Sequence, residues 1–115
     1  MENKKHAWVY CAIDAPEDTH GTLKGQRQQL MDYAEQMGFE VVGSSSDMGN
    51  LPLFERPGFK RFTDVARTGR ADILLVINEN CLSRSSMQIA QLQALAESYE
   101  IKVYSPLLGA ILYCQ

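Results

Sequence analysis

Two arginines, Arg56 and Arg84, stand on either side of a strongly apolar segment, and their placement suggests an anion-binding site. Arg56 directly precedes Pro57, and proline is typical of the first turn of a helix. Arg84 follows the apolar run at residues 73–77, which is typical of a buried strand. Ligands of open α/β sheets bind at the carboxyl ends of the strands, and a guanidinium matches phosphate oxygens with two parallel hydrogen bonds. The two arginines therefore predict a site for a phosphate or another small anion.

Candidate nucleophiles stand close to Arg84, namely Cys81, Ser83 and Ser85. A nucleophilic side chain needs a base beside it, and both histidines of the chain lie within its first 20 residues. Ser85 is better explained as a helix cap, because Ser85 and Gln88 have the spacing of a capping box. We interpret Cys81 as a semi-buried thiol rather than as a nucleophile.

The elements that would position these residues alternate between strands and helices. Apolar and β-branched runs predict strands at residues 7–13, 39–43, 72–77, 101–104 and 110–114. Helical spacing predicts helices over residues 22–37, 57–68 and 86–99, and residues 44–53 are expected to form a loop. This order predicts one domain over residues 1–115, a three-layer α/β/α fold with a mostly parallel sheet of about five strands.

The helical stripes are specific predictions about the core. We expect the buried side of the first helix to carry Leu23, Leu30, Met31, Ala34 and Met37, and that of the second Phe59, Phe62 and Ala66. The third helix should bury Ile89, Leu92, Ala96 and Tyr99. Gly38 and Gly69 stand where helices end.

Composition and charge limit the partners. The 115 residues carry a formal net charge of −3, which disfavours nucleic-acid binding by the whole surface. A basic cluster of Lys60, Arg61, Arg67 and Arg70 is interpreted as a solvated helix face. The apolar runs are too short to span a bilayer, and the N-terminus does not have the pattern of a secretory signal, so we expect a cytoplasmic protein.

Three widely spaced cysteines, Cys11, Cys81 and Cys114, form no metal-ligand motif. We expect them to be reduced thiols. No metal and no cofactor is predicted.

Five fragments in order make the chain resemble the catalytic domain of the serine recombinases, the resolvase and invertase family, from about residue 6 to about residue 105. They are the first-strand end Tyr10 to Asp14, Gln26 with Leu30 followed by Gly38, Asp47 with Gly49, the intact Arg56-Pro57-Gly58-Phe59, and Asn80 to Arg84. The resemblance implies the resolvase catalytic fold and an origin in a mobile element or a prophage.

The departures from the family pattern fall on its active-site residues. Asp14 stands where the family has its nucleophilic serine, and Ala12 and Cys81 stand where it has arginines. Asn80 replaces an aspartate, and Leu51-Pro52 replaces the Ser-Gly of a loop. Of the active-site groups that the resemblance implies, Gln26, Arg56 and Arg84 remain as candidates for anion binding.

These departures predict that no catalytic constellation is intact. Phosphoryl transfer needs several cationic donors, and losing one typically costs on the order of a hundredfold in rate. A carboxylate at Asp14 would repel a phosphate, and we expect it to pair with Arg56 and Arg84 in one crevice instead. The chain is therefore interpreted as a degenerate recombinase domain without recombination activity that acts as an interaction or regulatory module.

Two other functions stay open. One is a component of site-specific DNA recombination with altered chemistry. The other is a small-anion or nucleotide-binding domain, although no glycine-rich phosphate loop supports it. The expected partners are a second copy, giving a homodimer, or an intact recombinase. DNA should bind weakly or not at all to this chain alone, because the residues after Ser105 encode neither the family's long interface helix nor its DNA-binding segment.

Overall fold

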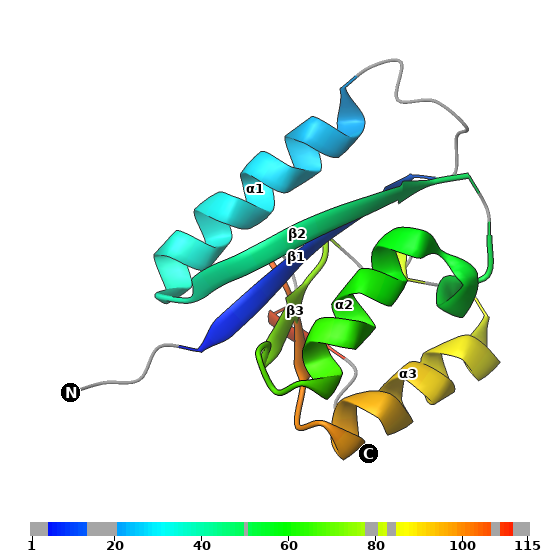
Figure 1. Cartoon of the computed structure of the whole chain (residues 1–115). Helices are drawn as coiled ribbons and strands as arrows, with labels where there is room; N and C mark the ends of the chain where they lie inside the picture. Colours follow the sequence, from blue (N-terminus) through cyan, green and yellow to red (C-terminus); the bar gives the residue numbers. More distant parts are fainter. Residues whose placement is uncertain are drawn as a thin grey trace.

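The computed structural model describes residues 5–13, 21–49, 51–77, 81–82, 85–106 and 109–111. In this part of the chain five strands form one sheet in the order β2-β1-β3-β4-β5 (Figure 1). The strands are β1 (His6–Ile13), β2 (Glu40–Met48), β3 (Ile73–Leu75), β4 (Lys102–Ser105) and β5 (Gly109–Ile111). The helices are α1 (Thr22–Met37), the short 3-10 helix η1 (Leu53–Glu55), α2 (Pro57–Arg67) and α3 (Ser86–Ser98).

The sheet is mostly parallel, as predicted. Strand β1 pairs in parallel with β2 and β3, β3 pairs in parallel with β4, and β5 runs antiparallel to β4. Figure 1 shows α1 on one face of the sheet and α2 and α3 on the other. This confirms the three-layer α/β/α architecture. None of the helices in the described ranges combines the length and apolar character that crossing a bilayer would need.

Strand β1 lies in the interior and contributes to the core on both faces, because successive side chains of a strand point to opposite sides. On the α1 side, Ala7, Val9 and Cys11 pack with Leu30 and Ala34. On the other side, Trp8 and Tyr10 join a larger cluster that contains Leu53, Phe59, Phe62, Ala66, Leu74, Val76, Leu82, Leu92 and Val103. The side that carries α2 and α3 therefore holds most of the buried aromatic side chains.

The helix ends follow the local signals in the sequence. Gly38 ends α1 in the left-handed conformation with φ 76°, and the Ser85 hydroxyl accepts a hydrogen bond from the Gln88 amide at the start of α3. The predicted stripe of α2 is buried in full. The last-turn predictions were wrong for Met37 and Tyr99, which are 44% and 42% exposed.

The second strand is longer than predicted. Residues 44–53 were expected to be a loop, but β2 continues to Met48 and stays paired with β1, with Ser45 opposite Tyr10 and Asp47 opposite Ala12. The polar composition misled the prediction, because an edge strand tolerates serine where a central strand would carry apolar residues. The third strand is shorter than the predicted 72–77. The fifth is observed at Gly109–Ile111, and the rest of its predicted range, residues 112–114, lies outside the described residues.

Candidate functional site

The carboxyl end of β1 is held by the side chain of Gln26 from α1. The Gln26 Oε1 atom accepts a 3.2 Å hydrogen bond from the Ala12 amide, and its Nε2 donates a 3.1 Å bond to the Ala12 carbonyl. The side-chain amide thus pairs with the backbone in the way that a neighbouring strand would. Both hydrogen-bonding groups of the Gln26 side chain therefore have a structural partner.

Cys81 completes this contact from the segment that follows β3. Its Sγ atom lies 3.8 Å from the Ala12 carbonyl oxygen and 3.9 Å from Gln26 Oε1, and the residue is 8% exposed. The structure therefore brings together three residues that the sequence singled out. The groups that meet are an alanine, the amide of Gln26 and the thiol of Cys81, and none of the three is positively charged.

Arg56 lies at the start of α2 and is 9% exposed. Its Nε donates a 2.9 Å hydrogen bond to the Leu51 carbonyl, and its Nη1 donates a 2.8 Å bond to the Cys81 carbonyl. A longer contact of 3.4 Å joins Nη1 to the Tyr10 hydroxyl. The guanidinium thus ties the loop before η1, the end of β1 and the segment after β3 together.

Asp47 caps the same helix from β2. Its Oδ1 accepts a 2.9 Å hydrogen bond from the Gly58 amide, and its Oδ2 accepts bonds of 3.0 Å from the Phe59 amide and 2.8 Å from the Tyr10 hydroxyl. A carboxylate at this end of a helix satisfies amides that have no partner within the helix and complements the helix dipole. Burial raises the pKa of Tyr10 well above its ordinary value, so the phenol stays protonated and acts as a donor to Asp47.

A third contact between β2 and α2 involves Ser45. The Trp8 indole donates a 3.0 Å hydrogen bond to the Ser45 hydroxyl, which in turn donates a 2.7 Å bond to the Gly58 carbonyl. Gly58 has to lie close to β2, since a Cβ there would stand 2.6 Å from the Ser46 carbonyl oxygen and 2.7 Å from Asp47 Oδ2. The glycine in the intact Arg-Pro-Gly-Phe fragment is thus explained by this close approach.

Cys11 lies beside the site on the α1 side of the sheet. It is 2% exposed, and burial, with a smaller effect from the neighbouring Cys81 thiol, raises its pKa to about 11. Cys11 and Cys81 are both free thiols. A thiol with so high a pKa is protonated at neutral pH and a poor nucleophile.

Several predicted site residues lie outside the described residues, namely Asp14, Asn80 and Arg84, as does the alternative nucleophile Ser83. The expected crevice of Asp14, Arg56 and Arg84 therefore stays a prediction. Sequence reasoning assigned no role to Tyr10, Ser45 or the capping oxygens of Asp47. Tyr10 and Asp47 belong to two of the fragments that resemble the family, and this was the feature of the sequence that could have pointed to them.

Comparison with known proteins identifies the family. Residues 15–107 match the family model described as the resolvase N-terminal domain. No curated protein matches the chain. The first strand, with Tyr10 and Ala12, lies before the matched residues, and so does position 14 of the sequence.

Solved structures share the fold. The N-terminal catalytic domain of TP901-1 integrase has a TM-score of 0.76 at 24% identity, covering 88% of this chain and 77% of that one. The C-terminal catalytic domain of ISC1926 TnpA, an IS607-like serine recombinase, has a TM-score of 0.78 at 20% identity, covering 87% and 68%. A resolvase family site-specific recombinase from Streptococcus pneumoniae has a TM-score of 0.80 at 16% identity, covering 97% and 79%. Because the family match spans most of the chain, this protein belongs to the resolvase N-terminal domain family, and its fold is that of the serine recombinase catalytic domains.

Proposed function

We propose that this protein is a non-catalytic resolvase-family domain that acts as an interaction or regulatory module in DNA recombination. The proposal rests on the hydrogen bonds that Arg56 makes. Its Nε and Nη1 donors are bound to the carbonyls of Leu51 and Cys81. A guanidinium with these bonds serves as a cross-link between segments, whereas transition-state stabilisation needs donors aimed at the reacting phosphate.

The positions where the resemblance implies two further arginines support the same conclusion. Ala12 and Cys81 contact one another, with the thiol 3.8 Å from the Ala12 carbonyl oxygen. Gln26, the third residue of this contact, has both side-chain groups bonded to the backbone of Ala12. The three side chains that meet at the end of β1 are thus neutral. A developing negative charge on a phosphoryl group would find little stabilisation from them.

The residue at the nucleophile position supports it too. Asp14 has no hydroxyl, and its attack on a phosphodiester would give a labile acyl phosphate instead of a stable ester.

A domain that has lost its chemistry but kept its fold is suited to binding. In the described part of the chain, every buried side-chain nitrogen or oxygen has a hydrogen-bond partner. Such complete satisfaction is typical of a uniquely packed native state. The partner we propose is a second copy of this chain or an intact recombinase, whose domain of the same fold offers matching surfaces.

The experiment combines a DNA assay with an association assay. Supercoiled plasmid is incubated with the full chain, with Asp14→Ala and with an intact serine recombinase on its own site. Nicking and protein-linked DNA are then measured. We expect both only with the intact enzyme. A covalent adduct formed by this chain and lost in Asp14→Ala would overturn the loss of catalysis.

The association assay adds this chain to the intact recombinase at increasing ratios. Recombination rate and co-elution on a sizing column are followed together. We expect co-elution, with the rate changing in step with it. A chain that stays monomeric, does not co-elute and leaves the rate unchanged would overturn the interaction role.

A further inference from the structure

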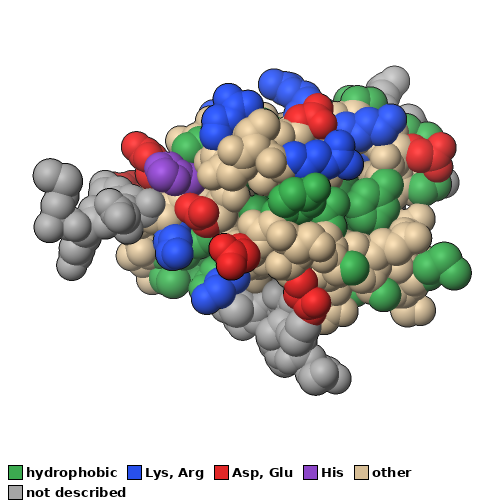
Figure 2. Space-filling model, turned by 60° about the horizontal axis from the view of Figure 1, so that its bottom comes forward, with side chains coloured by type: hydrophobic (Ala, Val, Ile, Leu, Met, Phe, Trp, Pro, Cys, Tyr) green, Lys and Arg blue, Asp and Glu red, His purple; other side chains and the backbone are tan. Residues whose placement is uncertain are grey.

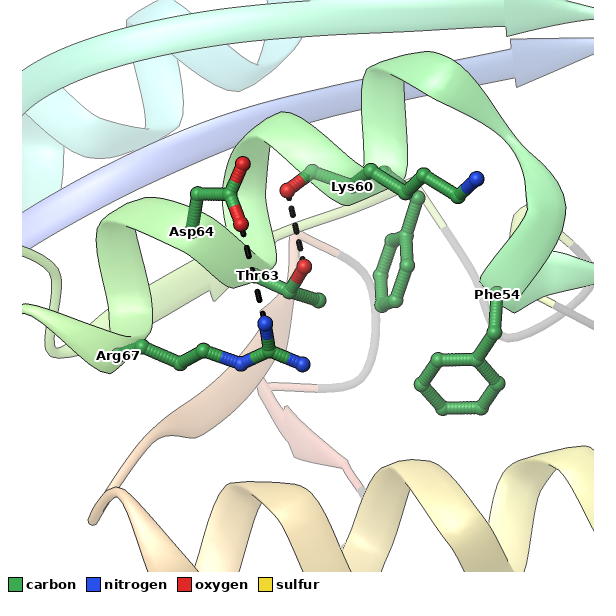
Figure 3. Close-up of a pocket in the computed structure, with 6 residues that line it drawn as sticks. Phe54, Lys60, Thr63, Asp64 and Arg67 are labelled. Carbon is green, nitrogen blue, oxygen red and sulfur yellow. Dashed lines mark hydrogen bonds and ion pairs between the residues drawn. The ribbon is translucent and has the colours of Figure 1, made fainter.

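We draw no further inference here: the strongest candidate, the surface groove that runs from Phe54 on η1 to Arg67 on α2 (Figure 3), carries none, because Phe59 in it is fully buried, acidic side chains lie among the basic ones on this side of the molecule (Figure 2), and nothing in the part of the chain that the structure describes shows what would cover it.

Discussion

The Tyr10 hydroxyl donates a 2.8 Å hydrogen bond to the carboxylate of Asp47, which joins an interior strand to the neighbouring edge strand beneath helix α2. The same carboxylate accepts the first amides of that helix, and the same phenol lies 3.4 Å from the Arg56 guanidinium. Tyr10, Asp47 and Arg56 thus connect β1, β2 and the start of α2. Their removal should be visible first in stability.

Replacing Asp47 tests this role. Asp47→Asn removes the negative charge and turns one acceptor into a donor that faces an amide, so we expect a loss of about 1–3 kcal/mol in the free energy of unfolding. Asp64→Asn is the matched control, because Asp64 is exposed and should change stability by less than about 0.5 kcal/mol. Urea unfolding followed by circular dichroism gives both values. Equal values for the two variants would show that the cap is dispensable.

Two glycines in helices provide a matched pair with opposite expectations. A Cβ at Gly58 would lie 2.6 Å from backbone, whereas a Cβ at Gly25, inside α1, meets nothing within 4 Å. Gly58→Ala should therefore destabilise the protein by about 1–3 kcal/mol. Gly25→Ala should stabilise it by about 0.5–1 kcal/mol through helix propensity. Thermal unfolding of both variants measures the difference, and stabilisation by Gly58→Ala would show that the close approach to β2 can relax.

The fold was predictable because its signals are local. The apolar run at residues 73–77 and the spacing of Phe59, Phe62 and Ala66 indicate burial from sequence alone. The three helix residues and residues 73–76 are buried as expected, whereas Ile77 is only partly buried. The end of β2 was missed because serines at residues 44–46 carry no strand signal of their own. They are held in the sheet by pairing with β1 and, at Ser45, by the Trp8 indole.

The site was predictable only in part, because its bonds join residues that are distant in the sequence. The motifs singled out Ala12, Gln26 and Cys81 one by one, and the structure shows that these three residues are in contact. They did not indicate that Arg56 would bond to two backbone carbonyls. Every residue has a backbone carbonyl, so the sequence does not show which of them accepts a hydrogen bond. The position of Asp14 and Arg84 relative to Arg56 stays a prediction.

Alkaline pH should destabilise the protein through Cys11. Its pKa in the folded state is raised from 9 to about 11, so the folded state holds the proton more tightly than the unfolded state. This contribution is fully present below pH 9 and is lost as pH rises to about 11, by about 2–3 kcal/mol. Tyr10, whose pKa is also raised by burial, adds a loss of the same sign above pH 10.

Urea unfolding at pH 8, 9.5 and 10.5 under reducing conditions measures this dependence. Cys11→Ala should unfold with a shallower decline between pH 9 and 10.5 than the parent chain. Parallel declines in the two proteins would mean that the Cys11 thiol does not titrate differently in the folded and unfolded states.

Restoring an arginine at position 81 should cost stability instead of creating activity. Cys81 is 8% exposed, and its side chain contacts Ala12 and Gln26. Its backbone carbonyl already accepts a hydrogen bond from Arg56. A second guanidinium there would be overpacked and close to a like charge, so Cys81→Arg should lower the free energy of unfolding by about 2–4 kcal/mol. Cys81→Ala, which only removes a thiol, should cost about 1 kcal/mol.

The same reasoning predicts the result of placing a serine at Asp14, where the resemblance implies the family's nucleophile. Asp14→Ser alone should produce no nicking of supercoiled DNA, because the hydroxyl would still lack cations at Ala12 and Cys81 to stabilise the phosphoryl oxygens. Asp14→Ser combined with Ala12→Arg and Cys81→Arg is the informative comparison, with folding checked by circular dichroism. We expect it to be inactive and less stable than the parent, since Arg56 uses its Nε and Nη1 donors to bind the carbonyls of Leu51 and Cys81. A stable triple variant that forms a covalent DNA adduct would contradict this expectation. It would show that the fold still accommodates the reaction and that Arg56 can take part in catalysis.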